Sequence, residues 1–445
     1  MPPRQDHDSR LALRRILSNF GWLLGGKGFG AISSLIYLAI LSRSLGVKDF
    51  GHFALIFGIS QAFVSLAGFQ TWQAIVKFGI PHLARGDRDA FARLSVLGGV
   101  VDVAAAVAGC LVATAVILLF GEALELNPAY DEMALAFICA MLLTRVSAPY
   151  GIIRALNRFE LSVWVGAITP AGRLLAAIGI WLTGPSVGRF LLAWALVELV
   201  TAIAMWFTAW RLGPEWLRPS RMREWRTAVA ENEGIRGFLA VTYWNTSLLA
   251  VTQQGPLLAV GYLFGTSAAG IYRIADQLAK GLGKFALLIS DAVYPEVNRQ
   301  RHAPQVDDFR IVVRRVNLAV IPMAAVVAGL SVAFGSDLLM LISGPGFEAG
   351  GLILVPLVIA ASLELASVSY EPVLHSVSKP HYLLFTRIAA VALLVVAVLA
   401  IPTDSLGVGW VVAYVQAFEY LVLSGLVWLA VRRLGRTARD RTINR

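Results

Sequence analysis

The stretch LGVKDFGHF at residues 45–53 matches FGTSAAGIY at residues 264–272. The match pairs Gly46 with Gly265, Gly51 with Gly270, and Phe53 with Tyr272. Each copy is a short glycine-bounded turn that leads into a long apolar run. The repeat therefore predicts a chain built from two related halves, with the turn at the start of the second membrane span of each half.

The composition indicates that both halves lie in a membrane. Of the 445 residues, 57% are apolar and only 15% are charged, and the mean hydropathy is +0.69. Apolar runs of about twenty residues recur along the chain, and each can cross a bilayer as a helix. We expect an all-α polytopic membrane protein with about twelve transmembrane helices. The expected spans are 20–42, 51–78, 94–120, 132–153, 161–182, 189–210, 236–263, 268–294, 311–334, 351–374, 383–401 and 408–430.

Basic residues mark alternate connections between these spans. Arginines or lysines occur at both chain ends and after every even-numbered span, whereas the loops after the third, ninth and eleventh spans carry acids and no base. The turn after the first span is an exception, because it carries Arg43 and Lys48. Since basic residues collect on the cytoplasmic side of a membrane, both termini are expected in the cytoplasm. This asymmetry explains the net charge of +10, so nucleic acid is not an expected partner.

The two halves divide the chain into an N-lobe at 1–212, a linker at 213–234 and a C-lobe at 235–445 that ends in a basic cytoplasmic tail. An even number of spans per lobe predicts two six-helix lobes related by a pseudo-two-fold axis along the membrane normal. In the linker, Met222, Trp225 and Val229 have helical spacing among arginines. They favour an amphipathic helix on the cytoplasmic membrane surface, the alternative being a plain linker.

The sequence carries none of the motifs that indicate an enzyme or a metal site. Cys110 and Cys139 lie within apolar runs without a CxxC spacing, and no GxxxxGK[ST] motif occurs. We therefore expect no catalytic residues, no cofactor and no metal. The external loops are short, which argues against a membrane enzyme such as a polysaccharide polymerase or ligase.

The stretch YRIADQLAKGLGK, which follows the second copy of the turn, places four charges between two apolar runs. At about 100° per residue, Arg273, Asp276, Lys280 and Lys284 fall within an arc of roughly 80°. A charged stripe with apolar flanks should face a cavity rather than lipid. Asp276 can pair with Arg273 or Lys280, which leaves net positive charge for a ligand. Alternatively, Arg273 lies near the external end of the helix and snorkels to the interface.

Three segments resemble bacterial polysaccharide flippases of the MOP exporter superfamily, the Wzx-type O-antigen and exopolysaccharide transporters. They read LSRSLGVKDFGHFALIFGISQAFVSLAGFQTWQAIVKFG at 41–79, RALNRFE at 154–160 and LGVGW at 406–410. The family's pattern of an Arg, a Leu-Gly pair and an aromatic-Gly pair is filled here by Arg43, Leu45, Gly46, Phe50 and Gly51. The span count, the repeat and the topology extend the resemblance over most of the chain.

The resemblance implies a V-shaped transporter in the bacterial inner membrane that works by alternating access without ATP hydrolysis. The implied cargo is an undecaprenyl-diphosphate-linked oligosaccharide repeat unit, moved from the cytoplasmic to the periplasmic leaflet. The transporter would be a monomer, coupled to H⁺, Na⁺ or the membrane potential, and would contact the polysaccharide polymerase machinery.

Ionisable and polar residues within the spans supply the candidate site. Lysine and arginine suit a diphosphate, and the candidates for a basic chamber are Lys27, Arg145, Arg173, Arg273, Lys280 and Lys284. The candidates for sugar contacts are Gln61, Gln70, Trp72, Gln73, Trp244, Asn245 and Gln253. The candidates for ion coupling are Asp276, Glu198, Glu364 and Glu419.

Structural roles are the alternatives for these residues. Arg145 and Arg173 can form structural pairs with Asp102 or Glu198. The carboxylates of the tenth and twelfth spans can be capped structural groups, and the amides and tryptophans can pack between helices.

Two related functions also stay open. A MATE-like exporter of small cations, coupled to H⁺ or Na⁺, would need an acidic or aromatic cavity, which the basic stripe disfavours. A lipid II flippase is expected to carry two further C-terminal spans.

Overall fold

The computed structural model describes residues 4–120, 128–213, 219–298, 306–367, 370, 380–400 and 403–443. Within these ranges the chain forms helices and no strand. Contacts divide the chain into two compact units. The N-unit consists of Met1–Leu45 and Ile56–Ser247, and the C-unit consists of Gly46–Leu55 and Leu248–Arg445.

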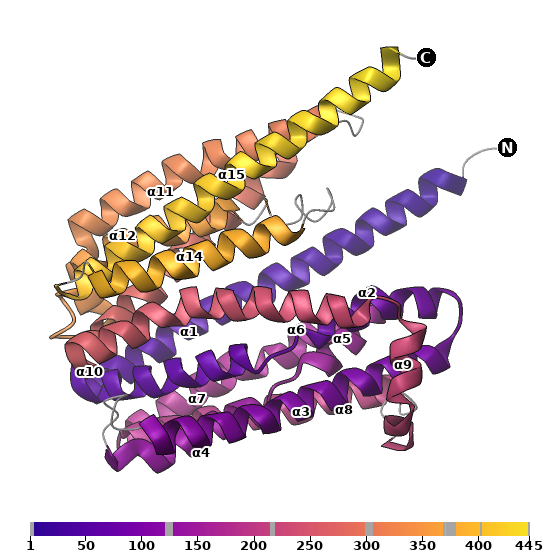
Figure 1. Cartoon of the computed structure of the whole chain (residues 1–445). Coiled ribbons are helices and arrows are strands. Elements are labelled where there is room, and N and C mark those ends of the chain that lie inside the picture. The colour runs from indigo at the N-terminus through magenta and orange to yellow at the C-terminus, as the bar shows by residue number, and fades with distance from the viewer. Residues whose placement is uncertain are drawn as a thin grey trace. The chain divides into compact units, whose positions relative to one another are not determined.

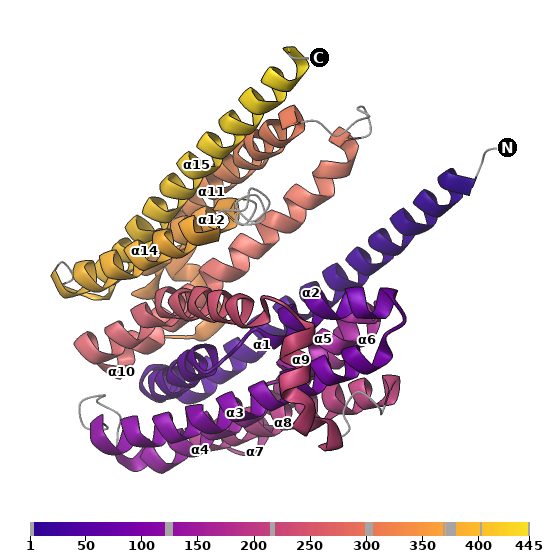
Figure 2. The same cartoon turned by 45° about the vertical axis from the view of Figure 1, so that its right-hand side comes forward.

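The first half of the chain runs through eight α-helices and two short 3₁₀-helices before the end of the linker. They are α1 (Arg4–Leu66), α2 (Thr71–Ala84), α3 (Arg88–Phe120), η2 (Pro128–Tyr130), α4 (Asp131–Leu143), α5 (Ser147–Ala155), α6 (Phe159–Gly166), α7 (Ile168–Thr183), α8 (Val187–Leu212) and η4 (Pro219–Glu224). Helices α3, α4, α7 and α8 run side by side (Figures 1 and 2).

The second half begins with the linker helix and continues through long helices. They are α9 (Trp225–Glu231), α10 (Ile235–Asn298), α11 (Val306–Ser343), α12 (Gly350–Ser367), α14 (Pro380–Ala400) and α15 (Ser405–Ile443). In the C-unit, α12 packs against α11 and α15, and α14 packs against α15 (Figure 1).

The predicted repeat has a matching backbone. Gly46 in α1 has φ 74° and ψ 176°, and Gly265 in α10 has φ 82° and ψ 175°, so each helix is interrupted at the paired glycine. A residue with a β-carbon rarely adopts this left-handed φ, which explains why glycine stands at both positions.

The two turns of the repeat also contact each other within the C-unit. A β-carbon on Gly270 would lie 2.9 Å from the carbonyl oxygen of Val47 and 3.1 Å from the α-carbon of Gly51. A β-carbon on Gly51 would in turn collide with the carbonyl group of Thr266. Val47 and Thr266 are equivalent positions of the repeat, so the contact is reciprocal.

Ten helices of the described residues are long and apolar enough to cross a membrane. Two of them, Gly28–Ala84 and Ile235–Gly281, include the interruptions at Gly46 and Gly265, and each contains one expected span in full and part of a second. The all-helical membrane fold predicted from the hydropathy pattern is confirmed.

The linker is docked onto the N-unit. Ala228 of α9 is fully buried in the same apolar core as Phe91 of α3, and Val229 packs against that core. The guanidinium group of Arg93 donates to both carboxylate oxygens of Glu231, at 3.0 and 2.5 Å. Trp225 remains 44% exposed, so one side of this short helix covers the N-unit and the other presents an aromatic ring.

Candidate functional site

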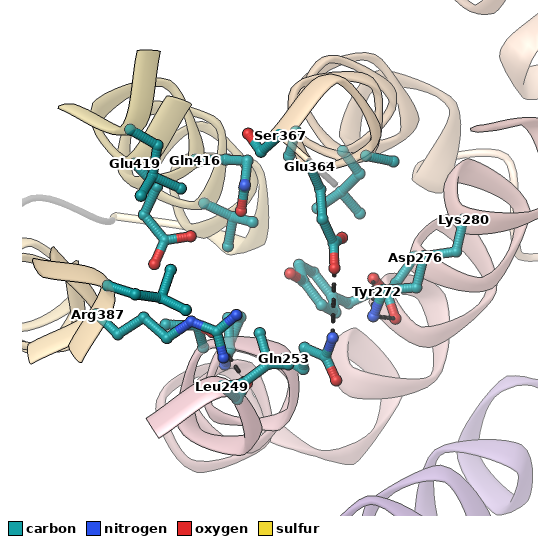
Figure 3. Close-up of a pocket in the computed structure, with 18 residues that line it drawn as sticks. Leu249, Gln253, Tyr272, Asp276, Lys280, Glu364, Ser367, Arg387, Gln416 and Glu419 are labelled. Atoms are coloured by element: carbon teal, nitrogen blue, oxygen red, sulfur yellow. Dashed lines mark hydrogen bonds and ion pairs between the residues drawn. The ribbon is translucent and has the colours of Figure 1, made fainter. Parts of the chain in front are cut away.

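The interruption at Gly265 divides α10 into a first arm before it and a second arm after it. A cavity of about 220 Å³ opens within the C-unit, between these two arms and helices α12, α14 and α15 (Figure 3). Leucine, valine, alanine and proline form much of its wall. Its polar lining consists of Thr252, Gln253, Tyr272, Asp276, Lys280, Glu364, Ser367, Arg387, Gln416 and Glu419. Ionisable groups at this depth of a membrane helix are costly, and they commonly mark a transport pathway.

The charged stripe of α10 supplies one side of the cavity. The Lys280 ammonium lies 2.9 Å from the carboxylate of Asp276, which is only 8% exposed. The guanidinium of Arg273 lies 3.8 Å from the same carboxylate. One turn of helix separates each partner from Asp276, which is why a single carboxylate can serve both cations. The pairing expected from the helical spacing is confirmed, and Asp276 pairs with both bases.

Two further carboxylates come from other helices. Glu364 of α12 accepts a hydrogen bond of 3.3 Å from the side-chain amide of Gln253 on the first arm of α10. Glu419 of α15 is buried, and it is attracted by the positive charge of Arg387 on α14 and repelled by Glu364. Figure 3 shows Glu419 with Arg387 on one side of the cavity and Asp276 with Lys280 on the other.

The charges that line the cavity are close to balance. Among the described residues, the carboxylates of Asp276, Glu364 and Glu419 face the cations of Lys280 and Arg387. With every group ionised, the lining therefore carries one excess negative charge rather than the net positive charge expected from the α10 stripe alone. In the described lining the α10 stripe contributes only the balanced pair of Asp276 and Lys280, whereas α12 and α15 add two carboxylates against one cation from α14, which a helical wheel of α10 cannot reveal.

Arg387 is the cavity residue that sequence reasoning missed. It stands alone in the apolar run of the eleventh expected span, so the rule that selected the other intramembrane charges would also have found it. Gln416, one turn before Glu419, was also overlooked.

The N-unit holds two of the candidate cations, Arg173 and Arg145, in structural contacts. Arg173 of α7 is 9% exposed, and its guanidinium donates to Glu198 of α8 at 2.8 Å while lying 5.4 Å from the ring of Phe57 and 5.6 Å from that of Trp194. The structural pairing of Arg173 with Glu198 is thus the geometry observed. Neither residue lines the C-unit cavity.

Arg145 lies where two membrane helices are interrupted. Its guanidinium donates to the carbonyl of Phe69 at 3.1 Å, in the break between α1 and α2, and it is attracted by Asp102 of α3. The Asp102 carboxylate accepts hydrogen bonds from the Thr71 hydroxyl at 2.7 Å and from the Ala148 backbone amide at 2.6 Å. One buried carboxylate therefore joins the N-termini of α2 and α5. Its negative charge also interacts favourably with the positive ends of both helix dipoles.

The candidates for sugar contacts fall into two groups. Gln253 lies in the C-unit cavity, whereas the Trp72 indole donates to Gln70 at 2.7 Å and contacts the ring of Tyr150 in the N-unit. Trp244 on the first arm of α10 is 57% exposed and packs edge-on against Tyr243.

The three other candidates are less exposed than Trp244. Gln61, Gln73 and Asn245 are half-buried in the N-unit. The side chains of Lys27 and Lys284 lie outside the described part of the structure, although both residues fall within helices.

The chain was compared with known families and structures. Residues 16–299 match the family described as polysaccharide biosynthesis protein. The chain is 25% identical over 293 residues to the inner membrane protein YghQ of Escherichia coli (strain K12), covering 65% of this chain and 81% of YghQ.

Solved structures share the fold at low sequence identity. An inward-facing multidrug resistance MATE family transporter of the MOP superfamily aligns with a TM-score of 0.65 and 14% identity, over 92% of this chain and 96% of that structure. The lipid II flippase MurJ in an inward closed conformation aligns with a TM-score of 0.60 and 13% identity, over 89% of this chain and 85% of MurJ. Because the family match covers more than half of its residues, the chain belongs to the polysaccharide biosynthesis protein family.

Proposed function

We propose that this protein is a flippase for an undecaprenyl-diphosphate-linked oligosaccharide, which it moves from the inner to the outer leaflet of the bacterial cytoplasmic membrane by alternating access. The observation that carries the proposal is the match of residues 16–299 to the polysaccharide biosynthesis family. The structural likeness to a lipid II flippase and to a MATE transporter supports transport as the activity.

The C-unit cavity supports a role in holding the charged end of the cargo. Its volume of about 220 Å³ is below the ~300 Å³ at which pockets for drug-sized ligands begin, so it suits a diphosphate or a coupling ion rather than a whole oligosaccharide. Lys280 and Arg387 are the described cations in its wall, and such groups bind phosphate through charge-assisted hydrogen bonds.

The near balance of charges suggests how cargo and ion are coupled. Lys280 is held by Asp276 at 2.9 Å, so neutralising that carboxylate would strengthen the attraction between the ammonium and a phosphate. Uptake of one proton by Asp276, Glu364 or Glu419 would cancel the excess negative charge of the lining, and uptake of a second would make the lining positive and favour the diphosphate. Proton release after the cargo leaves would restore the starting state.

Flipping can be measured directly in proteoliposomes. The purified protein is reconstituted with a fluorescent undecaprenyl-diphosphate oligosaccharide, and a membrane-impermeant quencher reports the share of the label in the outer leaflet. We expect the quenched share to rise well beyond that of protein-free vesicles. An unchanged share would refute the proposed function.

Two further arms of the same assay separate the related functions. Fluorescent lipid II replaces the oligosaccharide lipid in one arm, and efflux of ethidium is followed in the other. Faster movement of lipid II than of the oligosaccharide lipid would favour a lipid II flippase, and ethidium efflux driven by a pH or Na⁺ gradient would favour a MATE-like exporter.

A further inference from the structure

Lys77 of α2 is a membrane cation that the candidate site does not use. It lies in the N-unit and is exposed. Its ammonium sits 4.2 Å from the centre of the Phe238 ring on α10 and 5.4 Å from that of Phe78. Cations over aromatic rings gain an electrostatic attraction, so these rings fix the ammonium at the seam between α2 and α10.

The charge environment of Lys77 differs from that of the described cations that are site candidates or line the cavity. Arg173 pairs with Glu198, Arg273 and Lys280 share Asp276, Arg145 faces Asp102, and Arg387 faces Glu419. By contrast, no carboxylate of the described residues forms an ion pair with Lys77, whose described contacts are aromatic rings. An ammonium that is held in place but has no carboxylate of the protein as its partner can bind an anion from outside the protein.

The depth of Lys77 matches that of a lipid headgroup. Seven residues separate it from the end of α2 at Ala84, which corresponds to about 10 Å of helix. Arginines follow directly at 85, 88 and 93, and they mark this end of the helix as cytoplasmic. A lysine at this level extends its side chain towards the interface and brings the ammonium near the phosphates of the inner leaflet.

The surroundings of the ammonium suit a lipid rather than a soluble anion. Ile80, one turn along α2 from Lys77, is 47% exposed, and Val241, one turn along α10 from Phe238, is 43% exposed. Aromatic rings close the seam itself, since Phe69 stacks on Tyr243 with ring centres 4.7 Å apart and Phe78 meets Phe238 edge-on at 5.7 Å. A cation beside an apolar, ring-lined surface complements a phosphate headgroup followed by an acyl chain.

We propose that the α2–α10 seam is a binding site for a phosphate-bearing lipid, with the Lys77 ammonium as the ligand of the phosphate and Phe238 as the platform that positions it. The site goes beyond the proposed transport function and does not depend on it. Its occupant is either an anionic phospholipid of the inner leaflet or the diphosphate of a polyprenyl lipid, which share this chemistry.

Native mass spectrometry of the purified full chain can count bound lipids. The probes are phosphatidylglycerol, undecaprenyl diphosphate and inorganic phosphate. Lys77→Gln should weaken binding of at least one lipid about fivefold, the effect expected of one lysine near an anionic headgroup, while Lys77→Arg retains it. Arg236→Gln is the matched control, because Arg236 is exposed at the same end of α10 but two positions from Phe238 and so on another face.

The probes distinguish the possible outcomes. A loss for both lipids identifies a general phosphate site, and a loss for undecaprenyl diphosphate alone identifies the cargo as the occupant. Phe238→Leu removes the platform and should weaken binding of the same lipid. Equal lipid binding by the wild type and Lys77→Gln, or equal losses in Lys77→Gln and Arg236→Gln, would overturn the site, whatever the flipping assay shows.

Discussion

Gly51 and Gly270 pack directly against each other, so that a β-carbon on Gly270 would lie 3.1 Å from the α-carbon of Gly51. The two glycines occupy equivalent positions of the sequence repeat, and each also faces the turn of the other copy. Because backbone rather than a flexible side chain borders both positions, the contact cannot yield locally to a larger residue.

Gly270→Ala is therefore expected to destabilise the protein by about 1–3 kcal/mol, the usual cost of overpacking a tight contact. Unfolding in detergent, followed by heat or denaturant, measures the change. Gly281→Ala is the control, because Gly281 lies in the same helix and a β-carbon there meets no atom within 4 Å. That control should be neutral or stabilising by about 0.5–1 kcal/mol, since alanine favours helix over glycine. Equal stability of Gly270→Ala and the wild type would show that the two turns of the repeat can move apart at this contact without a loss of stability.

Asp102→Ala should cost about 3–5 kcal/mol, the usual effect of removing one partner from a buried charged network. The substitution leaves the Ala148 amide without its side-chain acceptor and Arg145 without its counter-charge, and it leaves the Thr71 hydroxyl with Ser147 as its acceptor. The free energy of unfolding in detergent measures the loss. Asp89→Ala offers a comparison on the same helix, because Asp89 is exposed and pairs with Arg221 at the surface. Loss of such a surface ion pair is expected to lower the free energy of unfolding by about 1 kcal/mol or less. Similar losses for both variants would contradict a special role of Asp102.

Lys280→Met is expected to lower the rate of flipping at least tenfold while the protein stays folded, because Lys280 is proposed to bind the diphosphate. The neutral double variant Asp276→Asn/Lys280→Met tests whether the ion pair matters only for stability, since it removes both charges at once. We expect the double variant to remain slow in the proteoliposome assay. If the double variant flips at the wild-type rate, the ion pair contributes to stability and Lys280 does not bind the diphosphate. Lys48→Met, at an exposed lysine in the first turn of the repeat, should leave the rate unchanged.

The sequence predicted the fold better than the site, for physical reasons. Hydropathy and the positions of the arginines depend only on local composition, and the glycine pattern reports a backbone φ that few other residues adopt. Gly46 and Gly265 could therefore be matched before the structure was known. The pairing of Asp276 with Lys280 was also predictable, because both lie on one helix at a spacing of four residues.

Contacts between helices could not be derived in this way. That Glu364 meets Gln253, or that Arg387 faces Glu419, depends on which faces of α10, α12, α14 and α15 point inwards. For the same reason, the charges that α12, α14 and α15 add to the described lining of the cavity could not be counted from the α10 stripe alone. Arg145 and Arg173 looked like members of a basic chamber because their partners Asp102 and Glu198 lie on other helices.

Glu364→Gln and Glu419→Gln test the proposed coupling. If these carboxylates take up the protons that accompany the cargo, each glutamine variant should flip at least tenfold more slowly under an imposed pH gradient and should lose much of the gradient dependence. The amide mimics a permanently protonated group, so cargo binding should be retained while the driven cycle stops. Glu348→Gln is the control, because Glu348 is exposed outside the cavity and carries the same chemistry. Replacing the pH gradient by a Na⁺ gradient shows whether H⁺ or Na⁺ drives flipping. If both variants flip at the wild-type rate under both gradients, neither carboxylate takes part in the coupling.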